Sequence, residues 1–326
     1  MVPPVPKGSC GWNVSSEWLP FADPFVATIG VFDGLHRGHE AILGPMLAEA
    51  RRRDLPSVLF TFRPRPVTVF APETPPDELT PPPRKWRLLA ERGVDRVIVL
   101  RFSAAFARVE AARFARTVLG ADSLLRAIWV GYDFRFGHRR QGDFALLQRL
   151  GGRYGFPTHR IEAIQEEGEP ISSSRIRRLV REGEIEAAAR LLGRWPDLEG
   201  RVVSGRGQGA KVLVPTANLD VPPTQCLPAI GVYAGQAEHG GEWVPAVMNL
   251  GTRPTLTEGE RIVPEVHLLG RSTELRGRSL LFRIRARLRG ERKFPDLNAL
   301  RRQVEADIRE TERRAAGWKE ADSGLA

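Results

Sequence analysis

The chain has 326 residues, of which 42% are hydrophobic and 27% are charged, and its 49 Lys and Arg residues give it a formal net charge of +10. This composition is typical of a globular protein long enough for two domains, and no apolar run approaches the ~20 residues that cross a bilayer. Two cysteines, Cys10 and Cys226, are too few for a disulfide framework, and the first residues lack a signal-peptide pattern, so we expect a cytoplasmic protein.

The first region alternates strand-like and helix-like segments. Strands are predicted at residues 25–29, 57–62, 96–100 and 127–130, and helices at 40–50, 84–92 and 111–119. A proline-rich loop is expected at 64–83. This alternation predicts a Rossmann-like α/β domain, a parallel sheet with helices on both faces that binds ligands at the carboxyl ends of its strands.

A glycine-containing loop follows the first predicted strand. Gly30 and Gly34 give the backbone freedom that a tight loop needs. His36 and His39 are three residues apart at the start of the next helix, so they share a face of its first turn, where free N–H groups favour an anion. Such a pair also occurs by chance, but the strand before it and the helix after it favour a site for nucleotide phosphates.

Two further segments have the residues of a nucleotide site. Residues 131–137 follow the fourth predicted strand, and Asp133 there can accept hydrogen bonds from a base or ribose, whereas its two phenylalanines are equally expected of a loop closed by core residues. Ser173 and Arg177 are four residues apart, so they share a helix face and could bind a phosphate. An ordinary capped, basic surface helix would have the same pattern.

The composition changes near residues 195–196, beyond which short β-rich runs begin. These runs lie at residues 200–203, 231–235, 243–248, 264–269 and 279–288, and an amphipathic helix is predicted at 297–315. Alternation of apolar and polar residues in several of them predicts half-buried antiparallel strands. We therefore expect a small antiparallel β-barrel with a C-terminal helix.

Thr216 and Asn218 follow a glycine-rich stretch at 205–209. In an extended backbone, residues two apart point the same way, so a hydroxyl and an amide oxygen could both bind Mg²⁺. The alternative is an asparagine-containing turn.

Basic residues are dispersed along the chain, and only five of the 49 are lysine. A basic protein could bind nucleic acid, but no module that combines basic and aromatic residues is visible. Phosphate-rich small substrates are the simpler interpretation of this charge.

The segment Gly30-Val-Phe-Asp-Gly-Leu-His-Arg-Gly-His39 resembles nucleotidyltransferases with a His-x-Gly-His motif, and within them the bacterial bifunctional riboflavin kinase/FMN adenylyltransferase (FAD synthetase) family. The resemblance extends over nearly all of the chain. It includes residues 131–137, 171–177 and 182–194, the Pro-Thr-Ala-Asn segment at 215–218, and residues 231–233, 249–255, 265–267 and 293–294.

The resemblance implies two reactions: ATP and riboflavin give FMN, and ATP and FMN then give FAD and pyrophosphate. It implies that His36, His39 and Arg177 stabilise charge during adenylyl transfer, and that Glu265 is the general base of the kinase. The further ATP contacts implied for the adenylyltransferase are Gly30, Phe32, Asp33, Gly34, Asp133 and Ser173. The ATP or flavin contacts implied for the kinase are Gly205, Gly209, Thr216 and Asn218, and the last two are also the implied Mg²⁺ ligands.

The resemblance also sets the expected organisation: an adenylyltransferase domain at 1–185, a linker helix at 186–199, a riboflavin kinase domain at 200–318 and a tail at 319–326. We expect small-molecule substrates only, no nucleic acid or membrane partner, and a monomer or weak homo-oligomer.

The chain departs from the family pattern at several points. Arg63 and Arg65 stand in Thr-Phe-Arg-Pro-Arg-Pro, where Thr-Phe-Asp-Pro-His-Pro is usual. The kinase loop at 213–218 is one residue shorter and lacks a glycine, Gln208 replaces an arginine, and Arg276 replaces a tyrosine. Because the departures outside residues 61–66 lie in the kinase half, we expect slower turnover there.

Two alternative functions use the same residues differently. One is a nucleotidyltransferase that acts on another phosphorylated acceptor and keeps a degenerate flavin-binding barrel. The other is a basic, flavin-responsive nucleic-acid binder without enzymatic activity, whose affinity would depend steeply on salt.

Overall fold

The structure, a computed structural model, describes residues 13–15, 23–73, 77–120, 124–204, 214–254, 260–271 and 275–318. The chain divides into two compact units, which are described separately: the first holds Met1–Pro76 and Thr80–Ser172, and the second holds Asp77–Leu79 and Ser173–Ala326. Among the described residues, none of the helices has the length and apolar character needed to cross a membrane.

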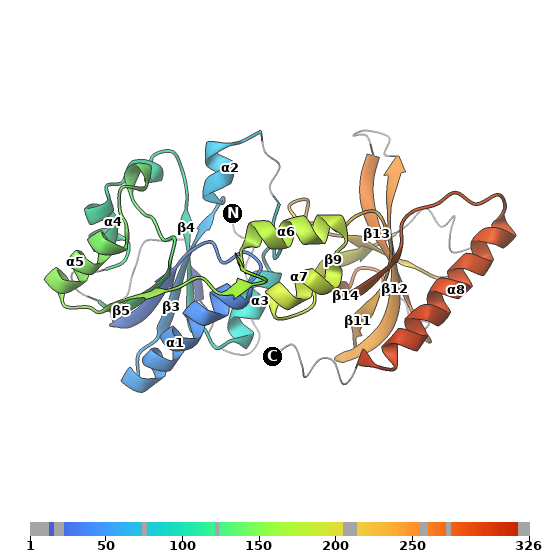
Figure 1. The fold of residues 1–326 in the computed structure, drawn as a ribbon, viewed down its shortest axis with the longest axis horizontal. Coiled ribbons are helices and arrows are strands. Elements are labelled where there is room, and N and C mark those ends of the chain that lie inside the picture. The colour runs from blue at the N-terminus through green and yellow to red at the C-terminus, as the bar shows by residue number, and fades with distance from the viewer. Residues whose placement is uncertain are drawn as a thin grey trace. The chain divides into compact units, whose positions relative to one another are not determined.

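The first unit contains a parallel six-stranded sheet in the order β1-β4-β3-β2-β5-β6 (Figure 1). Its strands are β1 (Asn13–Ser15), β2 (Phe25–Ile29), β3 (Ser57–Arg63), β4 (Arg96–Arg101), β5 (Leu125–Gly131) and β6 (Thr158–Ile161). Its helices are α1 (Arg37–Arg53), α2 (Pro66–Phe70), α3 (Arg84–Glu91), α4 (Ala111–Thr117) and α5 (Phe144–Tyr154), with single 3₁₀ turns η1 (Phe106–Arg108) and η2 (His138–Arg140). The short strands β7 (Gln165–Glu166) and β8 (Glu169–Pro170) form a separate hairpin.

Helices cover both faces of this sheet. Side chains of α4 and α5 pack on one face in a core that includes Phe25, Phe60 and Ile128. Side chains of α1 and α3 pack on the other, around Val26, Leu59 and other apolar residues. A strand buried on both faces has no solvent-facing side, which agrees with β2 being apolar at every position except the buried Thr28.

The expected α/β fold is confirmed, but several short elements were not predicted, among them β1 and the β7–β8 hairpin. The proline-rich segment at 64–83 is not all loop, because α2 begins there at Pro66, whose fixed φ suits the first turn of a helix. Helix α5 was not predicted, although its N-cap Asp143 accepts a hydrogen bond from the Leu146 N–H at 2.8 Å. That bond lowers the pKa of Asp143, as expected of a carboxylate that caps a helix. Strand β6 was also missed, since it is short and lies at the sheet edge.

The second unit is a closed antiparallel barrel in the order β10-β13-β12-β11-β14-β9. Its strands are β9 (Asp197–Val203), β10 (Ala217–Asp220), β11 (Gly231–His239), β12 (Glu242–Pro254), β13 (Glu260–Leu268) and β14 (Ser279–Arg289), and its helices are α6 (Ser173–Glu182), α7 (Ile185–Leu192) and α8 (Leu297–Ala315). The predicted barrel and C-terminal helix are therefore confirmed, while β10 was missed.

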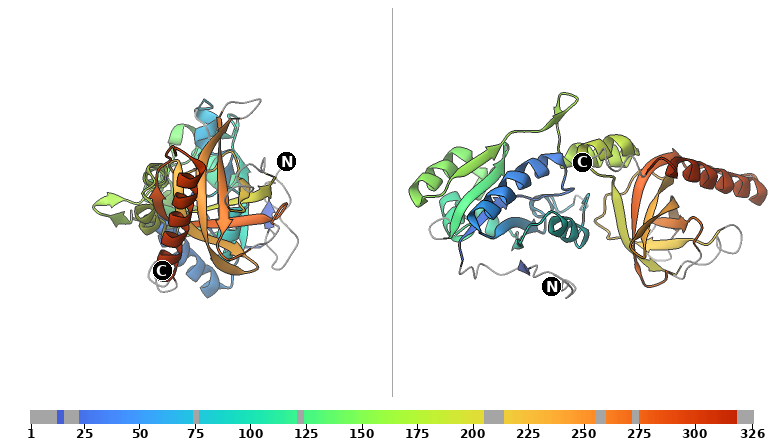
Figure 2. Two further views of the ribbon diagram at one scale, coloured as in Figure 1. Left: turned by 90° about the vertical axis from the view of Figure 1, so that its right-hand side faces the viewer. Right: turned by 90° about the horizontal axis from the view of Figure 1, so that it is seen from below.

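Helix α8 lies along the outside of the barrel and packs against β11 and β12 (Figures 1 and 2). The expected linker helix at 186–199 is shorter in the structure, since α7 ends at Leu192 and β9 begins at Asp197. Ile185 of α7 is fully buried in the barrel core cluster, so α7 contributes to the barrel's own core. The domain limits at 185 and 200 remain predictions.

Gly235 has no room for a side chain inside the barrel. A Cβ there would lie 2.2 Å from the Arg283 carbonyl oxygen and 2.4 Å from the Phe282 ring. We expect Gly235→Ala to destabilise the barrel by about 2 kcal/mol or more, the scale of overpacking a filled core. Calorimetric unfolding should show a lower transition temperature. Gly44→Ala is the matched control, because nothing lies within 4 Å of a Cβ on this exposed residue of α1; an equal loss in both variants would contradict the explanation.

Candidate functional site

The strand order of the first unit changes direction between β2 and β5. β3 and β4 lie on one side of β2, and β5 and β6 lie on the other. Open α/β sheets bind ligands at the carboxyl ends of the strands at such a point. The loops that leave β2 and β5 are those that carry the histidine motif and residues 131–137.

His36 and His39 come together at the start of α1. His36 is the N-cap residue, and His39 lies in the first turn with its N–H donating to the His36 carbonyl at 2.7 Å. The two rings stack with their centroids 3.7 Å apart and their planes 21° apart, and the Phe32 ring lies 4.8 Å from His39. A Cβ on Gly38 would come within 3.1 Å of the His36 ring, so glycine leaves room for this stack.

The loop before the histidines is held from inside the protein. Phe32, Gly34 and Leu35 all have positive φ, of 49°, 87° and 44°, and a residue other than glycine pays about 1–3 kcal/mol for this conformation. The Val31 carbonyl accepts hydrogen bonds from the buried Lys85 ammonium at 2.8 Å and the Thr61 hydroxyl at 3.2 Å. These two side chains, whose roles no local sequence pattern predicts, hold the strained turn in place.

Asp33 belongs to this loop and has only 2% of its surface exposed. Its carboxylate accepts a hydrogen bond from the Thr80 N–H at 3.2 Å and lies 3.7 Å from the guanidinium of Arg65. The structure therefore gives Asp33 a part in shaping the loop, and its predicted contact with ATP remains a prediction. Arg65, one of the two arginines that depart from the family pattern, is the ion-pair partner of Asp33.

The loop after β5 contains both buried and exposed residues. Phe136 is buried in the core and Phe134 stacks on it with ring centroids 5.3 Å apart, as the alternative interpretation of these phenylalanines predicts. Asp133 is exposed. A Cβ on Gly131 would lie 3.5 Å from Ile42 of α1, so the end of β5 lies against the helix that carries the histidines.

A cluster of aromatic rings, missed at the sequence level, lies at the carboxyl ends of β3 and β4. Phe62 is near the end of β3, Phe102 directly follows β4, and Phe70 ends α2. Phe102 lies edge-on to Phe62 at 5.7 Å and to Phe70 at 5.6 Å, and Phe70 is 68% exposed. Large aromatic side chains normally bury this area, so these rings form an accessible apolar ledge.

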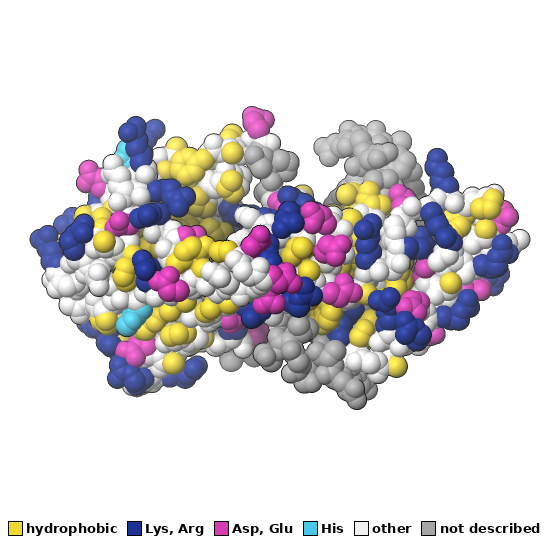
Figure 3. Space-filling model, viewed as in Figure 1, with side chains coloured by type: hydrophobic (Ala, Val, Ile, Leu, Met, Phe, Trp, Pro, Cys, Tyr) yellow, Lys and Arg dark blue, Asp and Glu magenta, His cyan; other side chains and the backbone are white. Residues whose placement is uncertain are grey.

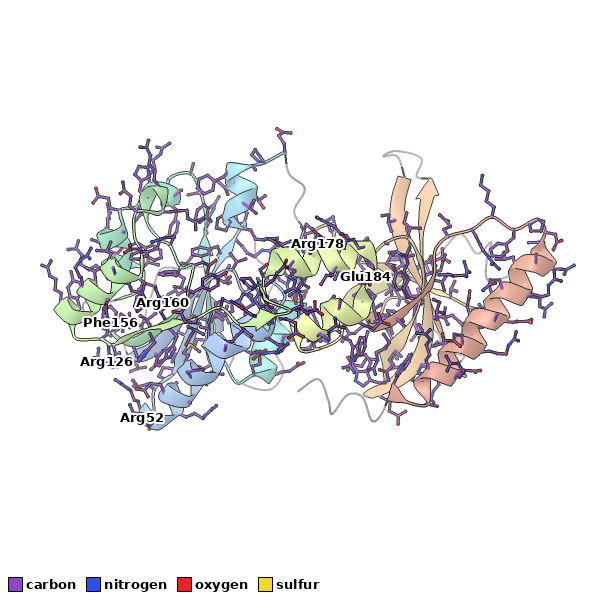
Figure 4. All side chains as sticks on the ribbon, viewed as in Figure 1. Arg52, Arg126, Phe156, Arg160, Arg178 and Glu184 are labelled. Atoms are coloured by element: carbon purple, nitrogen blue, oxygen red, sulfur yellow. The ribbon has the colours of Figure 1, made fainter. Side chains whose placement is uncertain are left out.

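Arg177 and Ser173 belong to the second unit, on α6. Arg177 donates to the Ser174 hydroxyl at 3.2 Å and has its Nε 4.0 Å from the carboxylate of Asp77, which also pairs with Arg181. Arg178 points away from α6 towards solvent (Figure 4) and pairs only loosely, at 3.6 Å, with Glu182. Because the histidines belong to the first unit, their predicted meeting with Arg177 at one ATP molecule remains a prediction.

A cavity of about 360 Å³ lies between the outer face of the barrel and α8. This volume is within the ~300–1,000 Å³ range of small-molecule sites. Apolar residues of β11, β12 and α8 line one part of it: Val232, Val247, Leu300, Val304 and Ile308. Polar residues line the rest: Thr216 just before β10, Asn249 on β12, and Glu265 and His267 on β13. The structure thus brings Thr216 and Glu265 together, although they are far apart in the sequence.

Glu265 stands at the centre of a row of polar residues across three strands. Its Cα partners are Asn218 on β10 and Asn249 on β12. Asn218 is 7% exposed, and its side-chain oxygen has no hydrogen-bond partner among the described residues. A buried, unsatisfied oxygen costs about 1–3 kcal/mol unless a ligand satisfies it. The Asn218 side-chain oxygen and the Thr216 hydroxyl are hard oxygen ligands of the kind that a divalent cation such as Mg²⁺ prefers. These residues therefore fit the implied metal.

Some predicted residues have structural roles, and others lie outside the described residues. Tyr233, from the matched segment 231–233, is buried in the barrel core, and its hydroxyl donates to the Ala229 carbonyl at 2.5 Å. Burial raises the pKa of Tyr233 to about 12, which keeps it a neutral donor. Gly205, Gly209 and Gln208 lie outside the described residues.

Comparisons with known proteins match each half of the chain to one of the two expected domains. An FAD synthetase family model matches residues 20–175, and a riboflavin kinase family model matches residues 192–315. Relatives named bifunctional riboflavin kinase/FMN adenylyltransferase are 40% identical in Escherichia coli K12, over 86% of this chain and 90% of that protein, and 31% identical in Bacillus subtilis, over 87% and 90%.

A crystal structure described as a macrolide-efflux protein from Streptococcus pneumoniae is 28% identical, with a TM-score of 0.82 over 90% of this chain and 95% of that one. Riboflavin kinases and FAD synthetases use ATP with a divalent metal ion. With a domain of each kind and relatives aligned over nearly their full length, this chain belongs to the bifunctional riboflavin kinase/FMN adenylyltransferase family, whose transferases make FMN and FAD.

Proposed function

We propose that adenylyl transfer uses His36, His39 and Arg177, and that riboflavin phosphorylation uses Glu265 with Thr216 and Asn218. The observation that carries the first assignment is the stacked histidine pair at the start of α1, at the strand switch point. The second rests on Glu265, which lines the cavity together with Thr216 and pairs with Asn218 on the neighbouring strand.

In adenylyl transfer, a phosphate oxygen of FMN forms a bond to the α-phosphorus of ATP, and the bond to the bridging oxygen breaks to release pyrophosphate. The protein supplies no nucleophile. The histidine imidazoles and the N–H groups at the start of α1 stabilise the negative charge that develops on the phosphates. Their positions are set before ATP binds, because the stack and the bonded loop hold them in place.

The ledge formed by Phe62, Phe70 and Phe102 is our candidate surface for the isoalloxazine ring of FMN. A flat aromatic ligand gains from contact with such rings, and Phe70 is exposed before any ligand binds. The ledge lies at the carboxyl ends of β3 and β4, on the same edge of the sheet as the histidine loop after β2.

In the kinase reaction, the 5′-hydroxyl oxygen of riboflavin forms a bond to the γ-phosphorus of ATP, and ADP leaves. Glu265 accepts the hydroxyl proton as general base. Thr216 and Asn218 would hold Mg²⁺, which neutralises phosphate charge when bound. The apolar side chains of the cavity, such as Val247 and Val304, would enclose the flavin ring.

The proposed setting is the cytoplasm, with a monomer or weak homo-oligomer and no nucleic-acid partner. On the face shown in Figure 3, basic and acidic side chains are interspersed over the described residues. Nucleic-acid binders typically gather basic residues on one face, and the described residues on the face in Figure 3 do not form such a cluster, which favours small phosphorylated substrates for this face.

His36→Ala, His39→Ala or Arg177→Ala should reduce FAD formation from FMN by about 100-fold or more, the scale of losing one preorganised charge stabiliser. FMN formation from riboflavin should stay nearly unchanged. Initial rates of both reactions, with products separated by chromatography, test this. Arg178→Ala is the matched control, since Arg178 is the next residue of α6 and is exposed, 3.6 Å from Glu182. Equal loss of both activities in the histidine variants would contradict the two-site assignment.

Glu265→Gln keeps the size of the side chain and removes the base. FMN formation should fall by about 100-fold or more if Glu265 takes the hydroxyl proton. Conversion of FMN to FAD should not change and serves as the internal standard. Glu238→Gln, at an exposed position of β11, should leave both rates intact. A Glu265→Gln enzyme with normal FMN formation would remove Glu265 from the mechanism.

Thr216→Ala and Asn218→Ala should each raise the Mg²⁺ concentration needed for half-maximal FMN formation, because each removes one oxygen ligand of a hard cation. Rates at fixed ATP over a range of Mg²⁺ concentrations measure this shift. Thr216→Ser keeps the hydroxyl and should retain the normal Mg²⁺ dependence. Unchanged Mg²⁺ curves for both alanine variants would show that these residues do not bind the metal.

A further inference from the structure

His267 lies beside the kinase residues without an assigned role. It follows Glu265 by two positions on β13 and lines the same cavity, so the two side chains share the outer face of the strand. Its ring Nδ1 lies 2.8 Å from the carbonyl oxygen of Pro215. Pro215 directly precedes Thr216, the proposed metal ligand.

This hydrogen bond occurs where the backbone ladder ends. The pairing of β10 with β13 comprises Ala217 with Val266 and Asn218 with Glu265. Continued by one residue, this register would set Thr216 opposite His267, but β10 begins only at Ala217. Pro215 has no N–H to extend a ladder. The His267 side chain therefore bonds to the chain just beyond the last backbone pair.

The bond also determines that Nδ1 of the imidazole ring carries a proton. A carbonyl oxygen can only accept, so Nδ1 must carry the proton, and in the neutral ring Nε2 is then the acceptor. The ring thus acts on Pro215 through one nitrogen only, which allows the two nitrogens to be tested separately.

We propose that His267 is a positioning residue of the kinase: through Nδ1 it holds the Pro215 carbonyl and so fixes the Thr216 hydroxyl where Mg·ATP binds. The inference rests on the proposed role of Thr216. Without this bond, residues 214–216 would have to be ordered when ATP binds, and the entropy of ordering would weaken Mg·ATP binding. Chemistry at the riboflavin hydroxyl would be affected less.

Three variants separate the two ring nitrogens. The side-chain amide of asparagine can place a donor near the position of Nδ1, whereas that of glutamine reaches the position of Nε2. His267→Ala and His267→Gln should raise the KM for Mg·ATP in FMN formation by about fivefold to tenfold, as loss of one hydrogen bond of ordinary strength predicts. His267→Asn should restore a nearly normal KM, and kcat and the KM for riboflavin should change less.

A second readout does not depend on turnover. Amide hydrogen exchange of peptides that cover residues 214–220, in the full-length protein without substrates, should be faster in the alanine and glutamine variants and normal in His267→Asn. FMN adenylylation should be normal in all three and reports that the protein has folded.

Rescue by glutamine and not by asparagine would overturn the proposal, because it would assign the role to Nε2 and a direct substrate contact. A normal KM and normal exchange in His267→Ala would also overturn it. If Thr216→Ala itself leaves the Mg²⁺ dependence and the KM for Mg·ATP unchanged, the proposed function of Thr216 fails instead. A raised KM in Thr216→Ala together with a normal one in His267→Ala refutes the His267 proposal alone.

Discussion

Both candidate sites depend on one constraint: where a backbone ladder stops, the main-chain polar groups beyond it must find other partners. After β2, the Val31 carbonyl accepts from Lys85 and Thr61. Before β10, the Pro215 carbonyl accepts from His267. In each unit the residues held in this way lead directly into the proposed functional groups, the histidines in one and Thr216 in the other. Side chains thus complete the ladders and fix the loops that carry the chemistry.

The elements that the sequence predicted are those whose burial imposes a period or an apolar run. β2 is buried on both faces, and its bounds agree with the predicted strand. Helix α8 likewise begins at Leu297 and ends at Ala315, as its amphipathic pattern indicates. Strand β10 has only four residues, two of them Asn218 and Asp220, and only its pairing with β9 and β13 makes it a strand. Helix α2, with five residues and none of them buried, lacks a periodic face altogether.

The residues of the candidate sites likewise divide into those that the sequence could identify and those that it could not. Local spacing could identify the histidine pair and the Thr216–Asn218 pair, because their members are close in the sequence. It could not identify Lys85, which bonds to a carbonyl 54 residues away, or His267, which bonds across 52 residues. Such partners have no sequence period, since they depend on which strands become neighbours. The aromatic ledge is likewise assembled from the ends of different elements.

Some of the many arginines interact with buried groups inside the protein, which the net charge alone does not indicate. Arg65, one of the arginines that depart from the expected motif, has its charge facing the buried carboxylate of Asp33. Arg285 is almost fully buried, with its guanidinium 4.5 Å from the Trp195 ring centroid and 5.1 Å from that of Trp318. A planar guanidinium can stack on rings and pair with carboxylates at once, which an ammonium does less well. Arg65 therefore helps to hold the histidine loop from within, since its charge lies 3.7 Å from the Asp33 carboxylate.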